Sequence, residues 1–183
     1  MIKIALFAAE GAEEIEALTV VDILRRAGME ADIVSLTDKK AVKGSHKIVF
    51  GAEALLSDID IDTYDGIVIP GGMPGTNNLK GNSTVCNAIK KFVTDKKMVA
   101  AICAAPSVLG ELSLLNGKKA TCYPGFEEKL YGATVLSDSV VVDENIITSR
   151  GMGTAIDFAL AIVSYYADET VASDLAESII YKK

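Results

Sequence analysis

The chain has 183 residues, half of them hydrophobic and 23% charged, which is typical of a globular protein rather than a disordered one. Its formal net charge of −7 at pH 7 argues against a nucleic-acid-binding protein and against binding to anionic membranes, because both partners require a basic face. Three cysteines without a Cys-x-x-Cys pair and a single histidine argue against a disulfide framework and against a zinc site built from Cys and His.

The first predicted element is a buried strand at Lys3–Ala9. Its apolar run is too short for the hydrophobic region of a signal peptide, and charges interrupt the later Ala-rich stretches before they could span a bilayer. We therefore expect a cytoplasmic protein with no membrane partner.

Short apolar runs then alternate with longer segments of helical periodicity, as in parallel βα units. Glu13–Ala27 is predicted to be a helix because apolar residues recur at three-residue steps from Ile15 and Leu18 onwards, and Gly28 marks its end. The next elements are predicted as strands at Ala31–Leu36, Lys47–Phe50, Gly66–Ile69 and Met98–Ile102, and as helices at Thr84–Asp95 and Pro106–Leu115.

The last third of the chain is predicted to add strands and two helices. Ala133–Leu136 and Val140–Asp143 fit an antiparallel hairpin with a polar tip. The other predicted elements are the strands Ala120–Tyr123 and Asn145–Ser149 and the helices Thr154–Tyr166 and Val171–Ile180. No linker or repeat interrupts the pattern, so we expect one α/β domain over residues 1–183, with a mostly parallel sheet and helices on both faces.

Four loops leave predicted strand ends with residues that could do chemistry. Sheets of this kind bind ligands outside the carboxyl ends of their strands, so we expect the four loops to meet in one crevice. The loops are Glu10–Glu16, Pro70–Gly75, Cys103–Pro106 and Arg150–Thr154.

Cys103 ends an apolar strand, and small residues lead from it directly into a helix. This is the arrangement of the strand–nucleophile–helix turn of hydrolases, although the glycines of Gly-x-Ser-x-Gly are absent. A thiol at a helix N-terminus lies near the positive end of the helix dipole, which favours the nucleophilic thiolate. The alternative is a small buried hydrophobic residue, which describes most free cysteines, and it stays open here.

The turn Pro70-Gly71-Gly72 follows a buried strand, so its N–H groups could stabilise an oxyanion; a plain tight turn is the alternative. Neither a P-loop nor a dinucleotide fingerprint is present, so no nucleotide cofactor is expected. Glu16 borders the buried side of the first helix, where a carboxyl tends to stay protonated and can donate a hydrogen bond.

Other reactive residues have structural interpretations. Glu13 and Glu14 lie at a helix start, where carboxylates stabilise the dipole. His46 is expected at the surface or in an interface rather than in catalysis, and Cys86 is expected to pack within a helix. Arg150 fits either an anion site or a structural salt bridge.

Six segments carry a resemblance that covers nearly the whole chain, and their order makes the set far more specific than any single motif. The segments are Gly11–Glu16, Arg25–Gly28, Ile69–Gly72, Ala100–Pro106, Thr148–Thr154 and Phe158–Val163. Together they resemble the ThiJ/PfpI (DJ-one) superfamily, in particular its parkinsonism-associated deglycase branch.

The resemblance implies a flavodoxin-like three-layer sandwich of the class I glutamine amidotransferase type, assembled as a homodimer without metal or cofactor. It implies that Cys103 is the nucleophile and that Glu16 is a protonated carboxyl hydrogen-bonded to its sulfur. Gly72 and Ala104 would supply backbone N–H groups to an oxyanion. The implied substrate pocket consists of Gly71, Tyr123, Arg150, Gly151 and Met152.

Three positions bear on substrate choice. Tyr123 stands where a related protein has a pocket histidine, and Met152 stands where it has a proline. Protease relatives carry a histidine directly after the cysteine, but this chain has Ala104 there, so a Cys-His protease dyad is not available locally.

The resemblance implies a glyoxalase or deglycase that acts on small 2-oxoaldehydes or glycated groups. The Cys103 thiolate would add to the aldehyde while Glu16 transfers a proton. The alternative is an oxidative-stress sensor or chaperone whose Cys103 oxidises to sulfinic acid without essential turnover.

Overall fold

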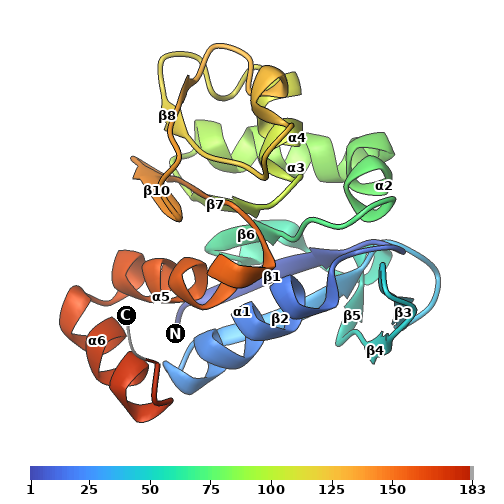
Figure 1. Ribbon diagram of the computed structural model, residues 1–183. Coiled ribbons are helices and arrows are strands. Elements are labelled where there is room, and N and C mark those ends of the chain that lie inside the picture. Colours follow the sequence, from blue (N-terminus) through green and yellow to red (C-terminus); the bar gives the residue numbers. More distant parts are fainter. Residues whose placement is uncertain (182–183) are drawn as a thin grey trace.

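A seven-stranded sheet forms the centre of the molecule (Figure 1). The structure, a computed structural model, describes residues 1–181. The strand order is β10-β11-β7-β6-β1-β2-β5, and every neighbouring pair is parallel except β10 with β11. The predicted, mostly parallel sheet is therefore confirmed.

The helices and strands have the following bounds. The central strands are β1 Lys3–Ala8, β2 Glu30–Ser35, β5 Ala54–Leu55, β6 Gly66–Ile69, β7 Met98–Ile102, β10 Val140–Asp143 and β11 Ile146–Ser149. Two small sheets pair β3 Ala41–Lys43 with β4 Val49–Gly51 and β8 Lys119–Ala120 with β9 Thr134–Val135. The α-helices are α1 Glu14–Arg26, α2 Gly75–Gly81, α3 Ser83–Thr94, α4 Pro106–Glu111, α5 Ala155–Tyr166 and α6 Glu169–Ser178.

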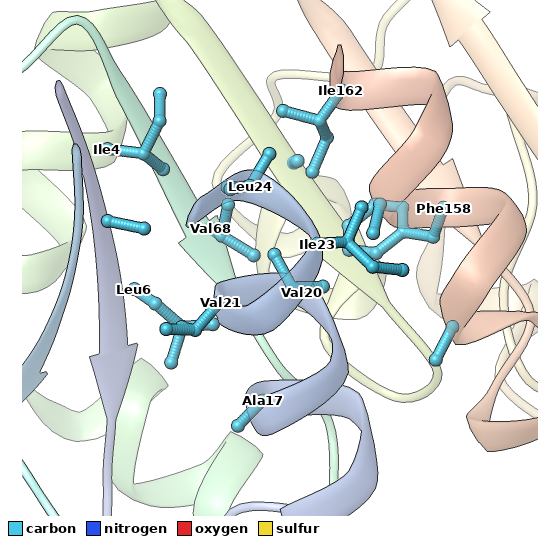
Figure 2. Packing of buried hydrophobic residues seen from close by; sticks show 14 of the residues in the cluster. Ile4, Leu6, Ala17, Val20, Val21, Ile23, Leu24, Val68, Phe158 and Ile162 are labelled. Carbon is cyan, nitrogen blue, oxygen red and sulfur yellow. The ribbon is translucent and has the colours of Figure 1, made fainter. Parts of the chain in front are cut away.

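Helices cover both faces of the sheet, which gives three layers. In Figure 1, α1, α5 and α6 lie on one side of the sheet and α2, α3 and α4 on the other. Successive residues of β1 point to opposite faces, so Leu6 packs in the α1/α5 core and Phe7 in the opposite core. Figure 2 shows Val20 of α1 and Phe158 of α5 packed in the first of these cores.

The sheet topology explains where a ligand could bind. β1 has β2 on one side and β6 on the other, so the order of the sheet reverses between β1 and β6. Loops that leave the carboxyl ends of two such strands run in opposite directions and leave a crevice between them. β7 and β11 continue the sheet beyond β6 with the same polarity, so the four predicted loops all leave the same edge.

The predicted apolar face of α1 was partly wrong. Ile15 and Leu18 were placed on it, but they are 47% and 38% exposed. Val21 and Leu24 of the same series are buried as predicted, and Ala17 and Val20, which were not in the series, are fully buried. A three-residue step is shorter than the 3.6-residue helical turn, so a series of such steps drifts around the helix and cannot mark one face throughout.

The predicted hairpin of Ala133–Leu136 with Val140–Asp143 was also wrong. β9 pairs in parallel with β8, whereas β10 pairs antiparallel with β11. A two-residue turn at Glu144 and Asn145, with Glu144 at a φ of 52°, connects β10 to β11. Tight two-residue turns with positive φ match the twist of paired strands, so this shorter connection forms the hairpin.

Other differences concern one strand that lies outside the central sheet, one helix that was not predicted and two elements that are shorter than predicted. The predicted strand at Lys47–Phe50 belongs to the β3–β4 hairpin outside the central sheet, and α2 was not predicted. The helix predicted at Pro106–Leu115 ends at Glu111, and the strand predicted at Ala120–Tyr123 is only the short β8. Among the described helices, none has the length and apolar character needed to cross a membrane.

We expect Phe158→Ala to lower the free energy of unfolding by about 3–5 kcal/mol, because the Phe158 ring is fully buried and its removal leaves a cavity between α5 and the sheet. Urea denaturation followed by circular dichroism measures this change. Val171→Ala on α6, where the side chain is 38% exposed, is the matched control and should change stability little. A loss in Phe158→Ala no larger than the control's would contradict the assigned core.

Candidate active site

Cys103 is the first residue after β7, and its φ of 65° lies in the left-handed region. A non-glycine residue there costs of order 1–3 kcal/mol and persists only where the surroundings hold it. Its N–H donates to the carbonyl of Ser149 (3.0 Å), and its carbonyl accepts from the N–H of Tyr123 (2.8 Å). Neighbouring segments therefore hold the strained turn that presents the sulfur.

Glu16 reaches the same point from the first turn of α1, and its side chain is almost fully buried. Its Oε2 accepts a hydrogen bond from the N–H of Gly71 (2.8 Å). The carboxyl also interacts with the Cys103 sulfur, although Oε1 makes no hydrogen bond of normal geometry among the residues described. The structure thus places the Glu16 carboxyl beside the Cys103 sulfur.

Gly71 allows this contact because it has no side chain. A Cβ at Gly71 would lie 2.6 Å from the Cβ of Cys103 and 2.8 Å from Oε2 of Glu16, closer than such atoms can approach. The backbone of the loop after β6 therefore lies directly against both the carboxyl and the sulfur-bearing residue. The absence of a side chain at Gly71 is needed for packing as much as for turning the chain.

The two predicted oxyanion donors also face the sulfur. The backbone N–H groups of Gly72 and Ala104 both lie near the Cys103 sulfur, and both lower its pKa. Gly72 has a φ of 86°, and a Cβ there would lie 2.4 Å from the nitrogen of Glu13. Two N–H groups that converge on one atom can stabilise a negative charge that develops on it or beside it.

The helix-dipole argument for an acidic thiol is contradicted. Burial and the charge of Glu16 raise the pKa of Cys103 to about 12, and the N–H groups of Gly72 and Ala104 oppose this only in part. The helix that follows, α4, starts three residues later at Pro106 and is only six residues long, so its dipole contributes little at the sulfur.

Burial likewise raises the pKa of Glu16, to about 7. The nearby charge of Glu13 also raises this pKa, whereas the hydrogen bonds from Gly71 and Cys103 lower it. A carboxyl with this pKa is neutral over much of the range below pH 7. The prediction of a protonated carboxyl beside the sulfur therefore has a direct physical cause, namely the burial of Glu16.

The remaining predicted pocket residues lie around the same turn. Tyr123 is bonded through its backbone to Cys103, and its half-exposed ring lies 3.2 Å from the position of a Cβ on Gly151. Met152 is 55% exposed. The guanidinium of Arg150 donates a hydrogen bond to the carbonyl of Ser137 (3.1 Å). Arg150 therefore has a structural contact as well as a position in the sequence next to Gly151.

Sequence reasoning missed the part that Glu13 plays in the site. Glu13 caps α1 by accepting from the N–H of Glu16 (2.7 Å), and its own N–H donates to the carbonyl of Gly71 (3.0 Å). It thus fixes α1 against the β6 loop and positions Glu16. The signal was present in the sequence, since a carboxyl three residues before another helical N–H is a capping pattern, but it was assigned only to the dipole.

The other two cysteines do not join the site. Cys86 lies in α3, and its sulfur donates to the carbonyl of Lys80 (3.3 Å). Cys122 is buried, and burial raises its pKa to about 11. A cavity of about 860 Å³ between β10, α5 and α6 is lined by none of the predicted site residues.

Comparison with known proteins agrees with this geometry. Residues 2–165 match the model of the DJ-1/PfpI family. The chain is 38% identical over 182 residues to protein DJ-1 homolog B of Arabidopsis thaliana, which covers 98% of this chain but 42% of that protein. The chain covers 45% of homolog A of the same plant. It therefore spans less than half the length of these two relatives.

A relative of similar size carries a functional name. The chain is 34% identical over 158 residues to a Caenorhabditis elegans protein named glutathione-independent glyoxalase DJR-1.2, covering 84% of this chain and 82% of that one. The solved structure of oxidized DJ-1 from Toxoplasma gondii superposes with a TM-score of 0.96 at 35% identity, covering all of both chains. The motifs, the fold and these matches agree, and the chain belongs to the DJ-1/PfpI family.

Proposed function

We propose that this protein is a cysteine-dependent glyoxalase or deglycase that acts on 2-oxoaldehydes such as methylglyoxal, or on groups glycated by them. The convergence of the Glu16 carboxyl and the N–H groups of Gly72 and Ala104 on the Cys103 sulfur is the observation that carries the proposal. The glyoxalase name of the Caenorhabditis elegans relative supports the same reaction.

In the proposed reaction the Cys103 thiolate adds to the aldehyde carbon, and the proton of the neutral Glu16 carboxyl passes to the oxyanion that forms. This gives a hemithioacetal and leaves Glu16 as a carboxylate. Glu16 removes the proton from that carbon and returns a proton to the neighbouring ketone carbon through an enediol, which leaves a thioester of the 2-hydroxy acid. Water then cleaves the carbon–sulfur bond and releases the hydroxy acid and the thiol. The aldehyde carbon is oxidised and the ketone carbon reduced, so the electrons stay within the substrate.

The position of one proton decides whether the sulfur can attack. The raised pKa values of Glu16 and Cys103 mean that the pair retains at least one proton at neutral pH. When that proton is on Glu16, the carboxyl no longer repels a thiolate and can donate a hydrogen bond to it. The reactive form is therefore a thiolate beside a neutral carboxyl, stabilised by the N–H groups of Gly72 and Ala104.

The surroundings of the sulfur suit a small, partly apolar substrate. The half-exposed ring of Tyr123 and the exposed side chain of Met152 offer apolar contacts beside the turn, and the phenol can donate a hydrogen bond. Arg150 directly precedes Gly151 and carries a positive charge, and its guanidinium donates to the carbonyl of Ser137. The alternative of an oxidation sensor uses the same sulfur, and none of these contacts favours it over turnover.

We also propose a homodimer. Large apolar side chains are exposed on two adjoining elements: Ile15 and Leu18 on α1, and Ile48 and Val49 at the β3–β4 hairpin, with exposures of 38–61%. Glu14 joins these elements because its carboxylate accepts from the backbone N–H groups of the hairpin tip. Exposed apolar side chains on two elements that contact each other are typical of an interface between protein chains.

Cys103→Ser should abolish the conversion of methylglyoxal to lactate without glutathione, because a serine hydroxyl does not ionise here to replace the thiolate. Glu16→Gln should lower kcat/KM by about 100-fold or more, the usual range for losing a general acid–base. Lactate release measures both effects. Iodoacetamide should still alkylate Cys103 in Glu16→Gln, which separates loss of proton transfer from loss of the nucleophile.

Cys86→Ser is the matched control for these variants, since Cys86 lies in α3 and makes no contact with the site. It should keep wild-type turnover. The proposal is wrong if Cys103→Ser retains wild-type activity, or if the wild type forms no lactate while Cys103 remains reduced.

The raised pKa of Glu16 predicts a pH-dependent stability. The folded state favours the neutral carboxyl, so this stabilisation is complete below the unfolded pKa near 4.5 and is lost as pH rises through about 7. Glu16→Gln cannot titrate and should gain up to about 3 kcal/mol of stability relative to the wild type between about pH 5 and about pH 8. Urea denaturation at both pH values tests this, and an equal difference at the two pH values would refute it.

Val49→Asp should convert the dimer to a monomer, because it places a charge in the proposed apolar interface. Sedimentation velocity measures the mass of the particle. Ile180→Asp is the matched control, since Ile180 is 81% exposed but lies at the opposite end of the chain, after α6. A monomeric wild type at micromolar concentration, or a dimer that survives in Val49→Asp, would exclude this interface.

A further inference from the structure

Glu13, Glu14 and His46 form a cluster next to the Cys103 site, and the proposed reaction uses none of them as a reacting group. Glu13 and Glu14 lie at the start of α1 with side chains 10% and 2% exposed, whereas the His46 ring, at the tip of the β3–β4 hairpin, is 71% exposed. One ligand atom from each residue lies within 4.8 Å of the other two.

Each carboxylate in the cluster has one oxygen held by backbone N–H groups and the other directed toward the ring. Oε1 of Glu14 accepts from the N–H groups of His46 (2.8 Å) and Ile48 (3.3 Å). Its Oε2 lies 3.1 Å from Nδ1 of His46, and the Ser45 hydroxyl contacts both of these atoms (3.3 and 3.1 Å) and has to give way to an ion. Oε2 of Glu13 accepts from the N–H of Glu16, which leaves Oε1 at 3.8 Å from the same nitrogen. Such hydrogen bonds orient ligand atoms in metal sites.

The spacing of these atoms fits a small divalent ion. Zinc binds carboxylate oxygen and imidazole nitrogen at about 2.1 Å, so neighbouring ligands of a tetrahedral ion lie about 3.4 Å apart. The two distances from Nδ1 of His46, 3.1 and 3.8 Å, lie on either side of this value. The oxygens of Glu13 and Glu14 lie within 4.8 Å of each other, so an ion between the three atoms requires the side chains to close around it.

Glu13 provides an independent indication of a ligand. Its side chain is nine-tenths buried, yet no hydrogen-bond donor in the described part of the chain reaches Oε1. The contacts of Glu14 are explained by its role in holding the hairpin tip, but that role does not explain why a second buried carboxylate directs an oxygen, 3.8 Å from Nδ1 of His46, at the same imidazole. Two buried carboxylates at one point also need a positive charge.

We propose that Glu13, Glu14 and His46 bind one divalent transition-metal ion of the zinc type. An imidazole ligand favours such an ion over Mg²⁺ or Ca²⁺, which prefer six or more oxygen ligands. In the bound form Nδ1 of His46 carries no proton and donates its lone pair to the metal, so any proton on that nitrogen leaves to solvent. Water completes the coordination on the exposed side of the ring.

The ion would join two segments that are more than thirty residues apart, the start of α1 and the hairpin tip. The sequence-based expectation of no metal site considered only cysteine and histidine ligands, and with a single histidine that argument is sound. Buried carboxylates from another segment supply the remaining ligands, and only the fold brings them to His46.

The test is a Zn²⁺ titration of the full chain by calorimetry, with wild type, His46→Ala, Glu13→Gln and Cys103→Ser compared. The wild type and Cys103→Ser should each bind one ion with the same affinity. His46→Ala and Glu13→Gln should bind at least about tenfold more weakly, as expected for the loss of a ligand. Glu10→Gln, which removes an exposed charge from the preceding loop, should bind as the wild type does.

A second measurement distinguishes this site from zinc bound by a cysteine. Co²⁺ in the wild type should show no sulfur-to-metal charge-transfer band, and Zn²⁺ should raise the thermal midpoint of the wild type but not that of His46→Ala. The proposal is overturned if the wild type binds no Zn²⁺, if binding is lost in Cys103→Ser, or if it is unchanged in folded His46→Ala.

Discussion

The contact between the Glu16 carboxyl and the Cys103 sulfur, made across the bare backbone of Gly71, is the constraint on which the rest of the site depends. Three elements must meet for it to form: α1 carries the carboxyl, β6 leads into the glycine and β7 ends at the cysteine. The two apolar cores hold these elements in place, because α1 packs on the sheet through residues such as Val20 and β7 is buried on both faces.

Three features of this arrangement make the folded state less stable. A buried carboxyl with a raised pKa, a thiol with a raised pKa and a cysteine at positive φ each favour a different local structure. Burial of the carboxyl leaves a neutral acid beside the sulfur, which is what proton transfer to and from a bound aldehyde requires. The fold thus holds together groups that would separate in a shorter or less well packed chain.

Three of the errors in prediction share one cause, which is that they concerned partners distant in the sequence. The strand Val140–Asp143 was correctly identified, but its partner was not, because pairing depends on the turn at Glu144 and on the free edge of β11. The thiol pKa was predicted from the nearest helix, whereas burial and Glu16, from another segment, decide its direction. Glu14 was assigned to the helix dipole, yet its carboxylate holds the hairpin tip around His46.

The sequence by itself determined the alternation of buried strands and helices, the parallel sheet and the identity of the strand-end residues Cys103 and Gly71, because these follow from local periodicity and from residues with few alternative uses. The family motifs added Glu16 and the donors Gly72 and Ala104. Only the tertiary structure decided which strands pair, which way the thiol pKa shifts and that His46 faces two buried carboxylates. These properties depend on distances between segments and on the exclusion of water, which no local pattern encodes.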